Sequence, residues 1–348
     1  MLKKQYGLCR FLLGFSINLK GKQVMNTNRF TRALCTVLGI AVVVAVTVFS
    51  CGCNENNQPS NASADEPAAT YSASTDEANP VSFLESIGID AVSLGIEPNV
   101  YNDASNKVGF QLNSPSEGDT IATLHTSMGD ITIRFFPTQA PKAVTNFINL
   151  AKDGKYNNTL FSKVTKDFMI NGGYCGTSSY GSQFEDEFCN KLFNIRGAVA
   201  MSNTGCDTNE SAFFINQTGA EAFKSQGGWT HLEEQWSALK KQFNNYKDSN
   251  LLTAFIDKNG TNCYNTDIVP NEVKQLYNQN GGNPYLDGAY NAVDRGYTVF
   301  AQVISGMDTV DKIAQVKTNE EGIPNESVII ESVEITAYSG NTAASTAE

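Results

Sequence analysis

The stretch FSKVTKDFMINGG, residues 161–173, contains most of two short β-rich segments, at 160–165 and 168–171, and ends in a pair of glycines. Aromatic, β-branched and other apolar side chains recur in both segments. Short runs of this composition that are bounded by turn residues are typical of β-strands. We therefore predict two short strands in this part of the chain.

The chain on both sides of this stretch continues the pattern. Further short β-rich segments lie at 121–127, 130–136, 198–201, 212–216, 297–304 and 327–335. Two conspicuous helices are predicted, at 142–151 and 307–315, and the first has apolar residues at helical spacing. Many short strands separated by turns predict a mainly β fold, a closed antiparallel barrel.

Five motifs, in order along the chain, resemble those of the cyclophilin family. The stretch at 161–173 is similar to the cyclophilin segment FHRxIxxFMxQGG. The others are APKAVTNF at 140–147, RGAVAMSN at 196–203, NESAFFI at 209–215, and NPYLDG at 283–288 with YTVF at 297–300. The resemblance covers residues 120–337. It implies an eight-stranded barrel capped by two helices, an active groove on its outer face, and peptidyl-prolyl cis-trans isomerase activity.

The resemblance also implies which residues form the groove. The pocket for the proline ring would consist of Phe168, Met169, Phe214, Tyr285 and Leu286. Tyr285 stands where the family has tryptophan or another aromatic residue.

The polar positions of the groove are partly retained. Asn203 is expected to contact the substrate backbone, and Asn171 replaces a glutamine. Ser202 replaces an alanine, and Tyr297 occupies a position often held by histidine. We expect all four to face the substrate.

The catalytic cation differs from the family pattern. Lys163 occupies the position of the catalytic arginine, Ser162 that of the preceding histidine, and Ala212 that of the glutamine in NGSQFFI. A guanidinium offers a rigid fork of donors, whereas an ammonium is a mobile, strongly hydrated point charge. We therefore expect Lys163, Phe168 and Asn171 to be the catalytic residues of an isomerase with reduced activity.

A different class of function stays open beside this enzyme. The same groove fits a non-catalytic module that binds proline-containing peptides or a partner protein, and a surface scaffold is a weaker third reading. Isomerisation itself needs no nucleophile, because its barrier of ~18–20 kcal/mol comes from the partial double bond of the peptide. We expect no cofactor and no metal.

The distribution of charge limits the choice of partners. Seven of the 25 basic side chains lie in residues 1–50, which contain no acidic residue. The rest of the chain therefore has 18 basic and 36 acidic side chains. Such an acidic body disfavours a nucleic-acid partner, which needs clustered Lys and Arg. The only two histidines, His125 and His231, leave little room for a histidine-rich metal site.

Residues 1–50 have the layout of an export signal, and Met25 is a possible true start. An uncharged apolar run at 33–49 follows Arg29 and Arg32. The run ends in VFSC, which resembles a bacterial lipobox and predicts lipidation of Cys51. The alternative is a single transmembrane helix, although 17 residues is short for a bilayer. Both predict a membrane-anchored, extracytoplasmic body. The family resemblance implies that its partners are proline-containing polypeptides.

The remaining segments flank or interrupt the predicted barrel. We predict a flexible tether at 51–80, an N-terminal extension at 81–119, a barrel domain at 120–340 and a flexible tail at 341–348. An insertion at 219–282 contains a predicted helix at 232–246. Its tryptophans, Trp229 and Trp236, are expected to form the insertion's own small core, with a partner-binding surface as the alternative. Cys175, Cys189, Cys206 and Cys263 are predicted to be either disulfide-bonded or free.

Overall fold

The computed structural model describes residues 79–97 and 100–340. The predicted export signal, the lipidation site at Cys51, the tether as far as residue 78 and the tail at 341–348 lie outside these residues. Within the described ranges, no helix is both long and apolar enough to cross a membrane.

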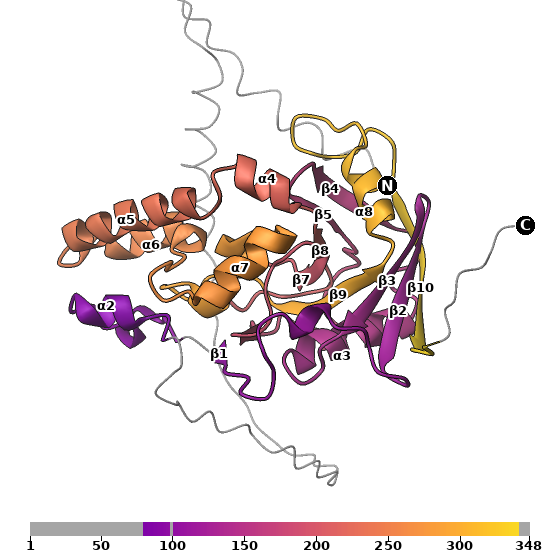
Figure 1. Cartoon of the computed structure of the whole chain (residues 1–348), viewed down its shortest axis with the longest axis horizontal. Helices are drawn as coiled ribbons and strands as arrows, with labels where there is room; N and C mark the ends of the chain where they lie inside the picture. Colours follow the sequence, from indigo (N-terminus) through magenta and orange to yellow (C-terminus); the bar gives the residue numbers. More distant parts are fainter. Residues whose placement is uncertain (1–78, 98–99, 341–348) are drawn as a thin grey trace, which may run out of the picture. The chain divides into compact units, whose positions relative to one another are not determined.

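Eight strands form a closed barrel (Figure 1). They are β2 (Thr120–Thr126), β3 (Gly129–Phe135), β4 (Thr159–Thr165), β5 (Met169–Gly172), β7 (Ala198–Met201), β8 (Phe213–Asn216), β9 (Val299–Ser305) and β10 (Ile329–Ala337). The order around the barrel is β10-β2-β3-β9-β7-β8-β5-β4, and β4 closes onto β10. Every pair of neighbouring strands is antiparallel. The predicted fold class is confirmed, and each predicted strand overlaps a strand of the barrel.

The barrel interior is filled by every second side chain of its strands. In β3, Ile131, Ile133 and Phe135 are buried, while the side chains between them are not, because successive residues of a strand face opposite sides. The second glycine of the stretch at 161–173 is also part of this packing. Gly173 has φ +72°, and a Cβ there would lie 2.3 Å from Cε1 of Phe213. Only glycine lets that ring enter the core.

Two helices pack against the barrel, as the resemblance implied. They are α3 (Pro141–Lys152), which contacts β9 and β10, and α8 (Met307–Ala314), which contacts β3, β4 and β5 (Figure 1). The first turn of α3 has no local side-chain cap. Instead, the Glu187 carboxylate accepts hydrogen bonds from the backbone N–H groups of Lys142 and Ala143 at 3.0 and 2.9 Å. A distant loop therefore fixes where this helix begins.

The insertion is more helical than the sequence predicted. It contains α4 (Ala220–Ser225), α5 (Gly228–Tyr246), α6 (Leu252–Asn259), the short 3-10 helix η3 (Gly260–Asn262) and α7 (Asn271–Asn280). The predicted helix at 232–246 is the larger part of α5. The other helices are short, with apolar residues too few to establish a periodicity. The 3-10 turns η4 (Pro284–Leu286) and η5 (Gly288–Tyr290) lead back to β9.

The described residues of the N-terminal extension form short helices and a strand and pack on the insertion. It contains α2 (Ser82–Ser86), η1 (Val92–Leu94), β1 (Val100–Tyr101) and η2 (Phe110–Leu112), and β1 pairs in parallel with β6 (Phe188–Cys189). The Phe83 ring meets Trp236 edge-on at 5.0 Å, and Trp236 is almost completely buried. The expectation that the insertion has a core of its own is therefore corrected: the extension shares this core.

Gln111 joins the extension to the barrel. Its fully buried side chain donates to the Phe193 carbonyl and to Oε1 of Gln302, and it accepts from the Phe193 N–H, all within 3.0 Å.

The four cysteines of the described chain are free thiols, which decides between the two alternatives left by the sequence.

Candidate active site

One row of paired residues on the outer face of the barrel forms the floor of the candidate groove. Lys163 of β4 is opposite Asn171 of β5, Asn171 is opposite Phe214 of β8, and Phe214 is opposite Ala200 of β7. Directly paired residues of neighbouring strands project to the same side of a sheet. The antiparallel register therefore brings a cation, an amide and an aromatic ring onto one surface.

The residues predicted to hold the proline ring belong to one apolar cluster. Its members from the predicted site are Phe168, Met169, Phe214, Tyr285, Leu286 and Tyr297. The Phe168 and Tyr285 rings lie 6.4 Å apart and are nearly parallel, and Tyr297 meets Phe214 edge-on at 5.3 Å. The Tyr297 N–H donates to the Leu286 carbonyl at 3.0 Å, which joins the two loops. The structure thus brings the predicted pocket together from four separate segments.

The polar wall of the groove is fixed by hydrogen bonds. Asn171 Nδ2 donates to Oγ of Ser202 at 2.8 Å. Asn203 Nδ2 donates both to Oδ1 of Asp186 and to the carbonyl of Gly296, each at 3.1 Å. The amide hydrogens of Asn203 are thus engaged inside the protein, and the side chain can offer its Oδ1 to a ligand as an acceptor.

Lys163 is the exposed member of the predicted site. Its aliphatic stem lies beside Gly322, where an added Cβ would be 3.4 Å from Lys163 Cγ. Among the described residues, no carboxylate lies within ion-pair distance of its ammonium. The charge is therefore free to interact with a ligand. Ala212, which replaces the family glutamine, contributes only its carbonyl here, which accepts from the Ser202 N–H.

Both tyrosines of the pocket remain neutral hydroxyl donors over the physiological pH range. Burial raises the pKa of Tyr285 to about 12. Burial and the nearby Asp186 carboxylate also raise the pKa of Tyr297. Each ring can therefore combine an apolar face with a hydrogen bond to a bound peptide.

Two cavities that include residues of the predicted site were not predicted by the motifs. One, of about 310 Å³, lies between the insertion and the turn at Pro284, and Tyr285 lines it together with His231. The other, of about 200 Å³, is lined by Asn203, Tyr297 and Arg295. Both are lined partly by residues of the insertion, for which the family motifs provide no template, so no motif could predict them.

The chain is a closed eight-stranded barrel protein with an apolar cluster beside two amides on its outer face. Comparison with known proteins makes the assignment specific. Residues 121–235 and 271–335 match the family described as cyclophilin type peptidyl-prolyl cis-trans isomerase/CLD. The chain belongs to the cyclophilin-type peptidyl-prolyl cis-trans isomerase family. The match omits residues 236–270, which lie inside the insertion.

Bacterial relatives support this assignment. A Staphylococcus saprophyticus protein described as a candidate peptidyl-prolyl cis-trans isomerase is 35% identical over 237 residues, which are 65% of this chain and 96% of that protein. A Staphylococcus aureus protein with the same description is 34% identical over 232 residues, which are 65% of this chain and 96% of that protein.

Two further similarities are more limited in what they show. A Streptococcus pyogenes protein described as a candidate bifunctional phosphatase/peptidyl-prolyl cis-trans isomerase is 34% identical over 225 residues, but the matched region spans only 61% of this chain and 38% of that protein. A crystal structure of a Cryptosporidium parvum cyclophilin type peptidyl-prolyl cis-trans isomerase aligns with 64% of this chain and 99% of its own, at 22% identity and a TM-score of 0.41.

Proposed function

We propose that this chain isomerises Xaa-Pro bonds of exported polypeptides in the groove beside Phe214. The observation that carries the proposal is the juxtaposition of an apolar pocket with the amides of Asn171 and Asn203. A proline ring fills the pocket, while the amides hold the peptide groups on either side of it. The carboxamide of Asn171 is one methylene shorter than the glutamine of the family motif.

The reaction requires only that the groove bind the twisted peptide bond better than the planar one. Rotation is slow because resonance gives the C–N bond partial double-bond character, and the bond loses that resonance at the transition state. The prolyl nitrogen then becomes pyramidal and accepts a hydrogen bond. A cationic donor at Lys163 stabilises this state more than the ground state, which is what accelerates the reaction.

The exposed position of Lys163 supports a modest rate. Removing one preorganised donor from an active site typically costs about 2.7–4 kcal/mol. An ammonium keeps the charge but not the rigid fork of an arginine, and Ala212 has no side-chain amide to orient it. We propose that the acceleration is real but smaller than that of a groove with arginine at this position.

The same two substitutions favour the second candidate, a module that binds proline-containing chains without turnover. In that case the pocket around Phe214 holds the proline, and the groove binds the planar and the twisted peptide bond equally well. The membrane location is a separate proposal. It rests on the apolar run at 33–49 and on the lipobox-like end at Cys51.

The test is the isomerisation rate of a short Ala-Pro reporter peptide with the full chain and with Lys163→Ala. We expect acceleration by the full chain and a drop of about tenfold or more in Lys163→Ala, which corresponds to about 1.4 kcal/mol. Lys241→Ala is the matched control, since this lysine is exposed on α5 of the insertion. Acceleration that is equal in all three proteins would remove Lys163 from the mechanism, and no acceleration by the folded chain would favour the binding module.

A further inference from the structure

The cavity of about 310 Å³ beside Pro284, which we call the insertion cavity, shares a wall with the predicted proline pocket. That wall is Tyr285, which lines the cavity and whose ring lies 6.4 Å from the Phe168 ring and nearly parallel to it. An extended peptide advances at most ~3.3–3.6 Å per residue. A side chain about two residues away from a proline beside Phe168 therefore reaches the insertion cavity.

The floor of the insertion cavity is apolar and held in place. Phe223 of α4 and Leu232 of α5 line it, and each is only 6% exposed. Both belong to the apolar cluster that contains the residues predicted to hold the proline ring. Trp229 meets the Phe223 ring edge-on at 5.9 Å, and the Tyr277 ring lies 6.1 Å from it. A floor packed in this way exists before a ligand arrives, which lowers the cost of binding.

Hydrogen bonds fix the cavity relative to the proline pocket. Gln226, on the rim of the cavity, donates from Nε2 to the Asp167 carbonyl at 3.0 Å. The Thr218 hydroxyl donates to the same carbonyl at 2.9 Å, and the Asp167 N–H donates to Oε1 of Gln217 at 2.8 Å. Asp167 directly precedes Phe168 in the chain. The insertion is thus attached to the turn that carries Phe168, so a single peptide can fill both places.

The lining of the cavity favours an uncharged ligand. Among the described residues, no side chain that lines it carries a carboxylate, an ammonium or a guanidinium group. Its rim is polar and includes Gln226, His231 and Gln235. An apolar floor with a few polar groups is typical of ligand pockets, and ~300 Å³ is the lower end of their size range. This volume suits one large side chain.

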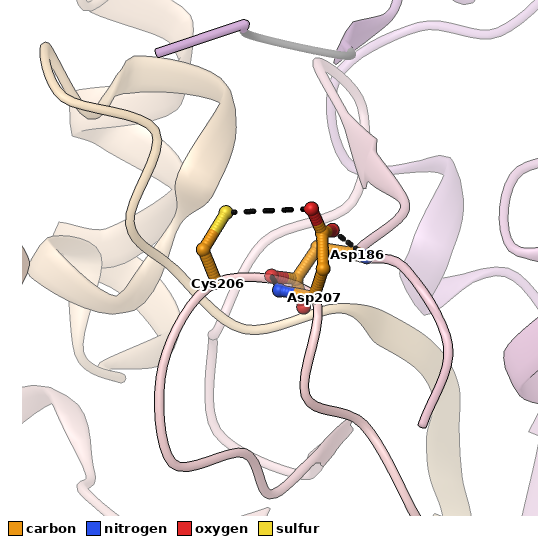
Figure 2. Close-up of side chains that lie close together, drawn as sticks. All are labelled: Asp186, Cys206 and Asp207. Carbon is orange, nitrogen blue, oxygen red and sulfur yellow. Dashed lines mark hydrogen bonds between the residues drawn. The ribbon is translucent and has the colours of Figure 1, made fainter. Parts of the chain in front are cut away.

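The opposite end of the groove is polar. Arg295 lines the cavity there, together with the groove residue Asn203. Asn203 donates to Asp186, which lies beside Asp207 and Cys206 (Figure 2). An apolar side chain placed there would displace water from charged groups without replacing their hydrogen bonds, which is costly. The apolar side chain of a bound peptide is therefore expected at the insertion cavity.

We propose that the insertion cavity is a second subsite of the groove, which takes a large apolar side chain, preferably aromatic, from the same peptide whose proline lies beside Phe168. The side chain belongs to a residue about two positions from the proline. The subsite makes the protein selective among prolyl peptides. The inference rests on the proposed use of the groove for such peptides, whether or not they are turned over.

The test compares prolyl peptides that differ in one side chain. The host is Ala-Ala-Ala-Pro-Ala-Ala, and Phe replaces Ala at each of the two positions before and the two positions after the proline, one at a time. We expect Phe at one of these positions to raise kcat/KM of the full chain by about tenfold or more over the host peptide. Glu at the same position should give no gain, because the cavity offers it no cation.

Filling the cavity should remove this preference. In Gln235→Trp a bulky ring replaces a half-buried side chain that lines the cavity, and in His231→Trp it replaces an exposed one on the rim. We expect the ratio of kcat/KM for the Phe peptide to that for the host to fall severalfold in both variants. Gln242→Trp is the matched control, two turns further along the same face of α5, exposed and outside the cavity. It should keep the ratio of the unchanged chain.

Calorimetric dissociation constants for the same peptides separate the subsite from catalysis. Acceleration without a preference for Phe at any position, or a preference that persists in both filled variants, overturns the subsite and leaves the isomerase. Tighter binding of the Phe peptide that is lost on filling, without acceleration of any peptide, supports the subsite and removes the proposed catalysis. A folded chain that neither binds nor accelerates any of the peptides overturns both.

Discussion

At the scale of single residues, the groove differs from its family pattern at Lys163 and Ala212. Restoring arginine at 163 supplies the rigid fork of donors, and glutamine at 212 supplies a side chain that can hold it. We expect Lys163→Arg to raise kcat/KM by up to about tenfold, or about 1.4 kcal/mol, and Lys163→Arg with Ala212→Gln to raise it further. The measurement is kcat/KM on a prolyl reporter peptide. Values at or below that of the unchanged chain in both variants would show that the loss does not lie in these donors.

Asp287 makes the stability of the protein depend on pH. Its carboxylate is enclosed and accepts hydrogen bonds from the Tyr277 hydroxyl at 2.6 Å and from the Asn194 backbone and side chain. Burial raises the pKa of Asp287 from 3.8 to about 7. Between these values the folded chain holds a proton that the unfolded chain has released. The free energy of unfolding therefore falls as the pH rises through this window.

Asp287→Asn should remove this dependence, because an amide resembles the protonated acid. Relative to the unchanged chain, the variant should gain stability from about pH 4 to about pH 8, by about 1.4 kcal/mol for each unit of the pKa shift. Urea unfolding at several pH values measures this difference. A difference that stays constant over the whole range would mean that Asp287 has an ordinary pKa in the folded protein.

Within the site, the motifs predicted which residues meet but not how they are held. The pocket around Phe214 and the position of Asn203 follow from short motifs, each carried by one strand or one turn. The hydrogen bonds from Asn203 to Asp186 and to the Gly296 carbonyl join loops far apart in the sequence. No local pattern encodes such contacts. The catalytic and substrate-binding roles assigned to the groove residues stay predictions.

At the scale of secondary structure, α3 depends on a cap from another loop. Glu187 accepts from two N–H groups of its first turn, and such caps contribute about 0.5–2 kcal/mol. We expect Glu187→Ala to lower the free energy of unfolding by about that amount, as measured by chemical denaturation. Glu185→Ala is the control, since Glu185 forms only a surface ion pair with Lys142, which contributes less than about 1 kcal/mol. An equal loss in both variants would argue against a specific cap.

The strands were more predictable than the insertion. The alternation of apolar residues in β3, or their helical spacing in α3, marks one buried face. Each of these elements can therefore be predicted from its own segment alone. The helices α4, α6 and α7 are short, and their burial depends on neighbours from distant segments. The two-residue strand β1 is too short to have a pattern at all. For the insertion, the sequence predicted one helix, whereas the structure has the four helices α4, α5, α6 and α7.

At the scale of the whole molecule, the described chain joins three apolar clusters. One fills the barrel, one lies between the barrel's outer face and the insertion, and one joins the insertion to the extension. The middle cluster contains the residues predicted to hold the proline ring. Residues of the insertion therefore pack against the proposed groove, which lies where the barrel motifs meet the insertion.

Exchange NMR on a short Ala-Pro peptide, with a small amount of the full chain, distinguishes turnover of the prolyl bond from binding alone. Uncatalysed interconversion takes tens of seconds or longer, so it gives no exchange cross-peaks between cis and trans resonances at short mixing times. We predict that the protein produces these cross-peaks and that Lys163→Ala weakens them. Shifted or broadened peptide signals without cross-peaks would contradict it, because they show a groove that binds proline and does not turn it over.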